Sequence, residues 1–96
     1  MSQVVEQRVE DDVGADQHRW MVVIFNNDHT PYDSVVRVLM LATNCDMREA
    51  YIETWEAHTF GRASVHFADR AECLAAAAII NTVGVRTAVC PEWEDR

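Results

Sequence analysis

The chain has 96 residues, of which 49% are hydrophobic and 25% charged, and this composition predicts one globular domain. Sixteen acidic residues oppose eight arginines, so the net charge is −8, and the sequence contains no lysine. This charge argues against a surface that binds nucleic acid or anionic membranes. Because the chain has no lysine, sites that depend on a Schiff-base lysine, a lysine general base or a phosphate-loop lysine are excluded.

Acidic residues gather at both ends of the chain. Residues 1–19 hold five acids and two arginines without helical or strand periodicity, which predicts a flexible acidic N-terminal extension. Residues 92–96 are a short acidic tail, and residues 20–91 are expected to form the domain. The start has no signal-peptide pattern, and no apolar run approaches the roughly 18–20 residues of a membrane span, so a cytoplasmic protein is expected.

The domain opens with a short apolar run, Trp20–Phe25, which predicts a buried strand. Residues 26–29 are Asn, Asn, Asp and His, which favour a turn. A helix is then expected over Pro31–Thr43, with Thr30 as N-cap and Asp33 as the acidic partner in a capping box.

A second helix is predicted from the same kind of signal. Asp46 is the expected N-cap, Glu49 stands at the third helical position, and Gly61 is expected to end the helix. Six side chains share one face of this helix by their spacing: Met47, Ala50, Tyr51, Thr54, Trp55 and His58.

The last elements are a strand, a helix and a strand. Residues Arg62–Phe67 predict a strand in which apolar and polar side chains alternate, the apolar ones being Ala63, Val65 and Phe67. Asp69 is the expected cap of a third helix that reaches Thr82. After Gly84, residues 85–90 predict the final strand.

The resulting order is β-α-α-β-α-β. It predicts a single small α+β domain in which a three-stranded sheet packs against three helices. The order of the strands within the sheet is left open by the sequence.

Motifs for catalysis or for a cofactor are missing from the sequence. The four histidines have no metal-binding spacing, and the three cysteines are widely separated without a CxxC pair, so free thiols and no metal site are expected. With three glycines there is no phosphate-binding loop. The chain is therefore expected to be neither an enzyme nor a cofactor-binding protein, although a small enzyme pairing His58 with Cys45 or Cys73 is a remote alternative.

Two segments at a characteristic separation resemble the ClpS family, the adaptors of AAA+ Clp proteases. They are WMVVIFNNDHTPYDSVVRVL at residues 20–39 and EAHTFGRASV at residues 56–65. The family has an apolar strand, a signature close to Asn-Asp-Asp-Tyr-Thr-Pro, an amphipathic helix, and a histidine near the end of its second helix. The resemblance covers about residues 20–90, and the family shares the β-α-α-β-α-β order.

The resemblance implies binding of proteins that begin with a bulky hydrophobic residue (Phe, Leu, Trp or Tyr) and their delivery to a Clp unfoldase of the ClpA or ClpC type. Asn26, Asp28 and His58 match the positions that hold the α-amino group in the family. The positions that line its hydrophobic pocket correspond to Thr30, Tyr32, Thr54 and Ala57. An α-ammonium group has three donors and no acceptor, so an amide oxygen, a carboxylate and a neutral imidazole suit it.

The chain departs from the family pattern at several positions. Asn27 replaces an aspartate as the expected loop contact, Tyr32 and Thr54 stand where methionines are usual, and Ala57 replaces a valine. A roomier or reshaped pocket is therefore expected. Asp69 matches an acidic residue implicated in chaperone docking, but the accompanying lysine is missing.

Two other readings stay open at this point. One is a ClpS-like interaction module with altered peptide or chaperone specificity that is not an N-degron adaptor. The other is a structural module without a peptide pocket, since related folds carry different functions. For the adaptor reading, the expected partners are N-terminal degron peptides and a Clp AAA+ unfoldase. A monomer is expected, with no nucleic-acid or membrane partner.

Overall fold

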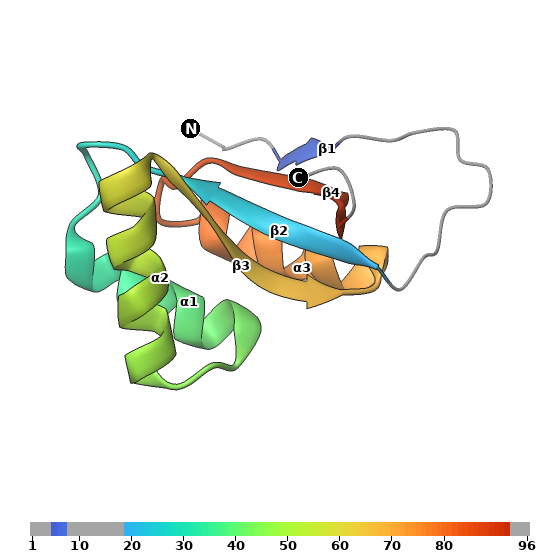
Figure 1. Cartoon of the computed structure of the whole chain (residues 1–96), viewed down its shortest axis with the longest axis horizontal. Helices are drawn as coiled ribbons and strands as arrows, with labels where there is room; N and C mark the ends of the chain where they lie inside the picture. The colour runs from blue at the N-terminus through green and yellow to red at the C-terminus, as the bar shows by residue number, and fades with distance from the viewer. Residues whose placement is uncertain (1–4, 8–18, 93–96) are drawn as a thin grey trace.

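The computed structural model describes residues 5–7 and 19–92. Most of the predicted extension at residues 1–19 and of the tail at residues 92–96 lies outside the described residues. Within the described part, helices cover one face of a twisted sheet (Figure 1). The elements are β1 (Val5–Gln7), β2 (Trp20–Phe25), α1 (Tyr32–Thr43), α2 (Met47–Phe60), β3 (Arg62–Ala68), α3 (Arg70–Asn81) and β4 (Thr87–Pro91).

The strand order in the sheet is β1-β4-β2-β3. β2 is antiparallel to both β3 and β4, which confirms the predicted three-stranded sheet and the α+β class. β1 adds a short fourth strand, parallel to β4. The sequence predicted no strand within residues 1–19. An edge strand offers unpaired backbone groups, and three residues can pair with it without any side-chain periodicity to reveal them.

The apolar run of β2 is buried on both faces of the sheet. Val22 and Ile24 face the helices and are 0% and 1% exposed, whereas Met21 and Val23 on the other face are 2% and 3% exposed. A strand buried on both sides requires an unbroken hydrophobic run rather than alternation, which is what the sequence has. β2 therefore anchors the sheet, and its carboxyl end leads directly into the loop discussed below.

The predicted alternation in β3 is wrong at its end. Ala63 and Val65 are buried as expected, but Phe67 is 55% exposed. The pairing with β2 shifts by one residue at a β-bulge between Ser64 and His66. An extra residue in one strand reverses the side-chain alternation beyond it, so Phe67 is turned away from the helices.

Two of the three predicted helix starts are confirmed. The carboxylate of Asp46 accepts a hydrogen bond from the Glu49 backbone N–H at 2.8 Å, and that of Asp69 accepts one from Glu72 at 2.7 Å. The predicted capping box of α1 is wrong, because Pro31 occupies the N-cap position and no side chain caps this helix. The Thr30 hydroxyl is used elsewhere, donating to the carbonyl oxygen of Val83 at 3.1 Å.

α2 buries small side chains and exposes its large apolar ones. Of the face picked out by spacing, only Ala50 and Thr54 are buried, whereas Met47, Tyr51 and Trp55 are exposed. Small side chains let α2 lie close to α1 and β3. Helical spacing identifies which residues share a face but does not say which part of the surface a neighbouring element covers.

Glu53 is the one carboxylate of α2 among the described residues that is buried, and its Oε1 atom has no hydrogen-bond partner. Burial, followed by the neighbouring Glu49 and Glu56 carboxylates, raises the pKa of Glu53 from 4.5 to about 8. A raised pKa means that the folded chain holds this proton more tightly than the unfolded chain does. Glu53 therefore makes the fold more stable in mild acid than at pH 8.

Replacing Glu53 with glutamine should raise the free energy of unfolding at pH 8 by about 1–2 kcal/mol, because it removes an unpaired buried carboxylate. The stability of the wild-type chain should fall as the pH rises from 4.5 to about 8, and the variant should lose most of this slope. Urea unfolding across this pH range measures both effects. The exposed carboxylate of Asp33 supplies the control, since Asp33→Asn should leave the slope in place; equal slopes in wild type and Glu53→Gln would contradict the prediction.

Candidate functional site

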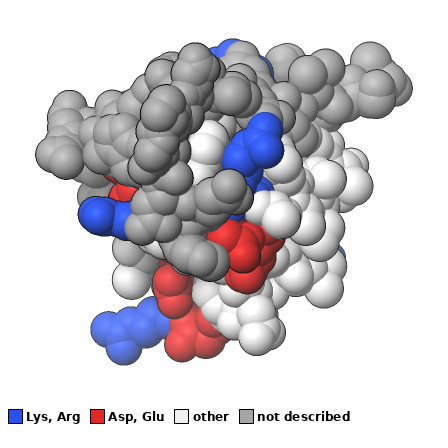
Figure 2. Space-filling model, turned by 90° about the vertical axis from the view of Figure 1, so that its right-hand side faces the viewer, with Lys and Arg blue, Asp and Glu red and all other residues white. Residues whose placement is uncertain are grey.

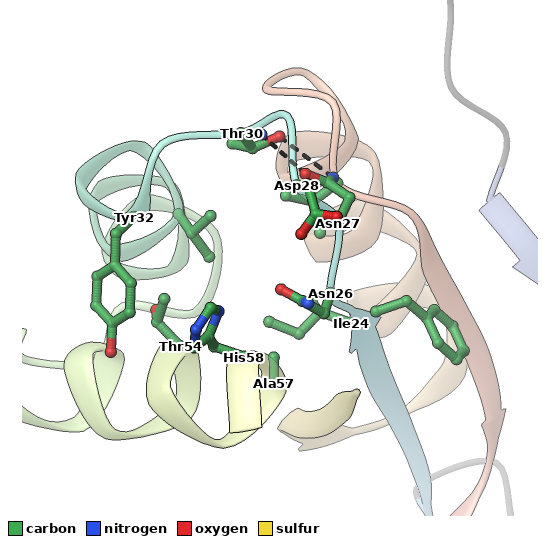
Figure 3. Close-up of a pocket in the computed structure, with 12 residues that line it drawn as sticks. Ile24, Asn26, Asn27, Asp28, Thr30, Tyr32, Thr54, Ala57 and His58 are labelled. Atoms are coloured by element: carbon green, nitrogen blue, oxygen red, sulfur yellow. Dashed lines mark hydrogen bonds between the residues drawn. The ribbon is translucent and has the colours of Figure 1, made fainter. Parts of the chain in front are cut away.

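A pocket of about 270 Å³ opens between the carboxyl end of β2, the loop that follows it, the start of α1 and the last turns of α2 (Figure 3). It is lined by Ile24, Phe25, Asn26, Asn27, Asp28, Thr30, Tyr32, Val35, Thr54, Ala57, His58 and Val85. All residues to which the family resemblance gave a role in amino-group binding, in the hydrophobic pocket or in the loop contact line this one cavity. Asp69, the predicted docking residue, lies elsewhere.

Three hydrogen-bond acceptors stand at the mouth of the pocket. Asn26, Asp28 and His58 are all exposed to solvent. In Figure 3, Asn26 and His58 point toward each other across the opening, and Asp28 lies above them. No arginine is among the lining residues, so the mouth offers acceptors and one carboxylate to a ligand.

The backbone explains why two distant segments meet at this mouth. The N–H of Asn26 donates to the carbonyl oxygen of Gly61 at 2.9 Å, which ties the end of β2 to the end of α2. Gly61 has φ 93°, a left-handed conformation that ends the helix and suits glycine. Since His58 lies in the last turn before Gly61, this bond brings the imidazole beside the Asn26 amide.

Asn27 organises the loop rather than facing a ligand alone. Its Oδ1 accepts hydrogen bonds from the backbone N–H groups of His29 and Thr30, both at 2.8 Å. Its Nδ2 donates to the carbonyl oxygen of Gly84 at 3.0 Å and to the Thr30 hydroxyl at 3.3 Å. The loop is therefore held against the turn between α3 and β4, and this positions the neighbouring Asn26 and Asp28 side chains.

The Asn27→Asp variant should keep the two acceptor bonds and lose both donor bonds. A carboxylate oxygen would then face the Gly84 carbonyl oxygen, and the free energy of unfolding should fall by about 1 kcal/mol. Chemical denaturation measures this loss. The wild-type chain measured under the same conditions is the reference. An unchanged free energy of unfolding in Asn27→Asp would show that the bond to Gly84 contributes nothing.

The base of the pocket is apolar. Ile24, Ala57 and Val85 are no more than 4% exposed. Thr54 is also buried, and its hydroxyl donates to the Ala50 carbonyl oxygen of the same helix at 2.7 Å. Because that hydroxyl is already bonded within α2, the base presents hydrocarbon to whatever enters the cavity.

Sequence reasoning missed four lining residues: Ile24, Phe25, Val35 and Val85. Ile24 and Phe25 end a strand that was correctly predicted, and their closeness to the signature loop was a usable signal. Val85 carries no such signal. It reaches the pocket because the turn after α3 is bonded to the loop through Asn27 and Thr30.

Tyr32 forms a wall of the pocket and lies against a second tyrosine. The rings of Tyr32 and Tyr51 have centroids 5.2 Å apart, and the Tyr32 ring meets the His58 ring edge-on at 6.4 Å. The Tyr32 hydroxyl donates to the Tyr51 carbonyl oxygen at 3.4 Å. Desolvation, with a smaller contribution from Tyr51, raises the pKa of Tyr32 above 10.0, so its phenol stays neutral and keeps this donor role.

Asp69 lies at the start of α3 and is half-buried. One of its carboxylate oxygens is occupied by the Glu72 backbone N–H. Figure 2 shows charges of both signs side by side at one end of the molecule. The structure therefore shows Asp69 as the N-cap of α3, and docking of a chaperone through Asp69 is taken up under the proposed function.

Other kinds of site find little support in the described residues. No group of three or more histidine, cysteine or acidic side chains is placed to hold a metal ion there, and no helix is both long and apolar enough to cross a membrane. Burial raises the pKa of the Cys73 thiol to about 11, and neither Cys45 nor Cys73 lines the pocket beside His58. The remote cysteine–histidine alternative therefore gains nothing from the fold.

The pocket combines hydrogen-bond acceptors at its mouth with an apolar base. The chain was compared with known proteins to find which of them share its fold and sequence. A solved structure with the same fold is that of Agrobacterium tumefaciens ClpS2 bound to L-phenylalaninamide. It is 23% identical, covers 80% of this chain and 100% of its own, and has a TM-score of 0.74. No curated protein sequence matches the chain. The family model described as "ATP-dependent Clp protease adaptor protein ClpS" matches residues 15–87. Because that match spans most of the sequence, the chain belongs to the ClpS family of Clp protease adaptors.

Proposed function

We propose that the chain binds proteins whose first residue is Phe, Leu, Trp or Tyr and delivers them to a Clp AAA+ protease. The observation that carries this proposal is the pocket itself, in which three acceptors border the mouth of an apolar cavity. The bulky side chain of the first residue would occupy the cavity. The free α-amino group would lie at the mouth, where Asn26, Asp28 and His58 are exposed.

The chemistry of a chain end matches this arrangement. An α-ammonium group has three N–H donors, and the mouth supplies an amide oxygen, a carboxylate and an imidazole nitrogen. An internal peptide group has one donor and no charge, so it would leave two of these acceptors without partners. Recognition of the free end is therefore a matter of donor number and charge as well as shape.

The ligand in the ClpS2 structure has the same chemical parts. L-phenylalaninamide carries a free amino group and a benzyl side chain, and it is bound to a protein of the same fold. The pocket described here offers a place for each part, with Asp28 near the mouth and Ile24, Thr54 and Ala57 at the base.

Delivery would involve surfaces away from the pocket. We propose that the acidic extension of residues 1–19 and the start of α3, with Asp69, contact the Clp unfoldase. The unfoldase would be of the ClpA or ClpC type, and the adaptor would act in the cytoplasm as a monomer. The missing lysine near α3 makes the charge of this surface different from the family pattern.

The test is a titration of fluorescent peptides that differ only in the first residue. Phe, Tyr, Trp and Leu should each bind at least about tenfold more tightly than Gly, because an apolar side chain is buried in the cavity. A reporter protein beginning with Phe should also be degraded faster by a Clp protease when the adaptor is present. Equal binding of Phe- and Gly-initial peptides would contradict the proposal.

A second reading is an interaction module of the same family with altered specificity. The observations that favour it are Tyr32 and Thr54 in the pocket and Asn27 in the loop, where the family pattern has other residues. The same titration separates the two readings. Preference for a small or β-branched first residue would support the second one.

A further inference from the structure

α2 exposes a row of large apolar side chains, which we call the aromatic stripe: Met47, Tyr51, Trp55 and Phe60. They are 63%, 55%, 50% and 68% exposed, respectively. Met47, Tyr51 and Trp55 follow one another every fourth residue, so they lie along one side of the helix. The rings of Trp55 and Phe60 meet edge-on with centroids 5.7 Å apart. An exposed apolar patch of this kind on a small protein marks an interaction surface.

The aromatic stripe begins at the wall of the pocket. Tyr51 packs against Tyr32, which lines the cavity, and Tyr32 in turn meets His58 at the mouth. The hydrogen bond from the Tyr32 hydroxyl to the Tyr51 carbonyl oxygen fixes this junction. Tyr32 therefore joins the mouth, at His58, to the aromatic stripe, at Tyr51.

We propose that the aromatic stripe binds the second to fourth residues of a peptide whose first residue occupies the pocket, and that it favours apolar side chains there. This inference rests on the proposed function. An extended peptide advances about 3.3 Å per residue, whereas one helical turn rises about 5.4 Å. Trp55 lies three residues before His58 along α2 and Tyr51 lies seven, so three extended peptide residues that leave the mouth beside His58 are long enough to pass Trp55 and to reach about as far as Tyr51.

The size of the aromatic stripe suits a short peptide better than a second copy of the chain. Large aromatic side chains present about 150–250 Å² each, so the three aromatic side chains of the stripe, at half to two-thirds exposure, offer roughly 250–450 Å², to which Met47 adds a smaller area. A stable protein–protein interface needs about 800 Å² from each partner. A few peptide residues, already held by the first residue in the cavity, can use a surface of this size.

The experiment compares two Phe-initial peptides, one with leucine and one with serine at positions two to four. The leucine peptide should bind the full chain about 5- to 10-fold more tightly, because aromatic anchors bury apolar side chains. Trp55→Ser and Tyr51→Ser should reduce this preference to less than about twofold. Ile79→Ser is the control, because Ile79 is 39% exposed on α3, outside the aromatic stripe.

The serine peptide reports whether the pocket is intact. Its affinity should be the same in wild type and Trp55→Ser, since Trp55 does not line the cavity. Equal binding of the two peptides by wild type, or a preference that survives both stripe substitutions, would overturn the inference while leaving the proposed function standing. If neither peptide binds, the proposed function fails as well. Loss of a dimer on Trp55→Ser in sedimentation would assign the aromatic stripe to a second copy and overturn the inference.

Discussion

Acetylation of the amino terminus should lower the affinity of a Phe-initial peptide by at least about 1,000-fold. The modification removes the positive charge and leaves one N–H where there were three donors. At least two acceptors among Asn26, Asp28 and His58 would then face the bound peptide without a partner. Each unmatched polar group costs about 1–3 kcal/mol, and the charge-assisted bond to Asp28 is the strongest of the three.

Anisotropy titration of the free and acetylated peptides measures this difference directly. A second arm removes the same interaction from the protein side, since Asp28→Asn keeps the shape of the side chain and removes its charge. Asp28→Asn should lower the affinity for the peptide with a free amino terminus by about 10- to 100-fold. It should leave the weak binding of the acetylated peptide unchanged. Asp33→Asn removes an equal charge from the exposed first turn of α1 and should have little effect. Tight binding of the acetylated peptide would rule out amino-group recognition by this mouth.

Filling the base of the pocket should abolish binding by a different route. Thr54 is 4% exposed and lines the cavity, so Thr54→Phe places a benzyl group inside a space of about 270 Å³. The first side chain of the peptide could no longer enter, and burial of a Phe or Leu side chain supplies about 1.5–3 kcal/mol. Affinity for Phe- and Trp-initial peptides should therefore fall by about 100-fold or more, because steric conflict adds to the lost burial.

Two variants show whether such a loss comes from the pocket. Thr54→Val keeps the size of the side chain. The hydroxyl that it removes donates to the Ala50 carbonyl oxygen within α2 and not to the peptide, so peptide affinity should change by less than about threefold. Thr59→Phe adds the same benzyl group at an exposed position of the same helix and should bind peptide normally. Circular dichroism of Thr54→Phe checks that the fold is retained. A folded Thr54→Phe that still binds Phe-initial peptides would place the first side chain somewhere else.

Most of the fold was predictable because its signals are local. The buried strand Trp20–Phe25 is recognisable as an uninterrupted apolar run, and Asp46 and Asp69 cap their helices through bonds within three residues along the chain. The errors arose where a distant segment competes for a local group. Thr30 was expected to cap α1, but its hydroxyl bonds Val83, which is 53 residues away.

The residues of the candidate site also divide into those indicated by a local signal and those that only distant segments bring together. Resemblance to the family signature predicted Asn26, Asp28 and His58 as ligands of the amino group. The fold brings them to one mouth through the bond from the Asn26 N–H to the Gly61 carbonyl oxygen. Val85 was missed because nothing in its own neighbourhood along the chain indicates that the turn after α3 closes the pocket.

The sequence by itself determined the α+β class, the order of the elements from β2 to β4 and the set of polar side chains in the loop. These depend on apolar periodicity, on caps and on turn residues, each of which acts over a few positions. The tertiary structure alone decided which face of each element is covered. The bulge in β3 turns Phe67 outward, and close packing of the small side chains of α2 leaves Tyr51 and Trp55 exposed beside the pocket. Periodicity defines faces, but burial is settled by the neighbours that the chain brings together across long distances in sequence.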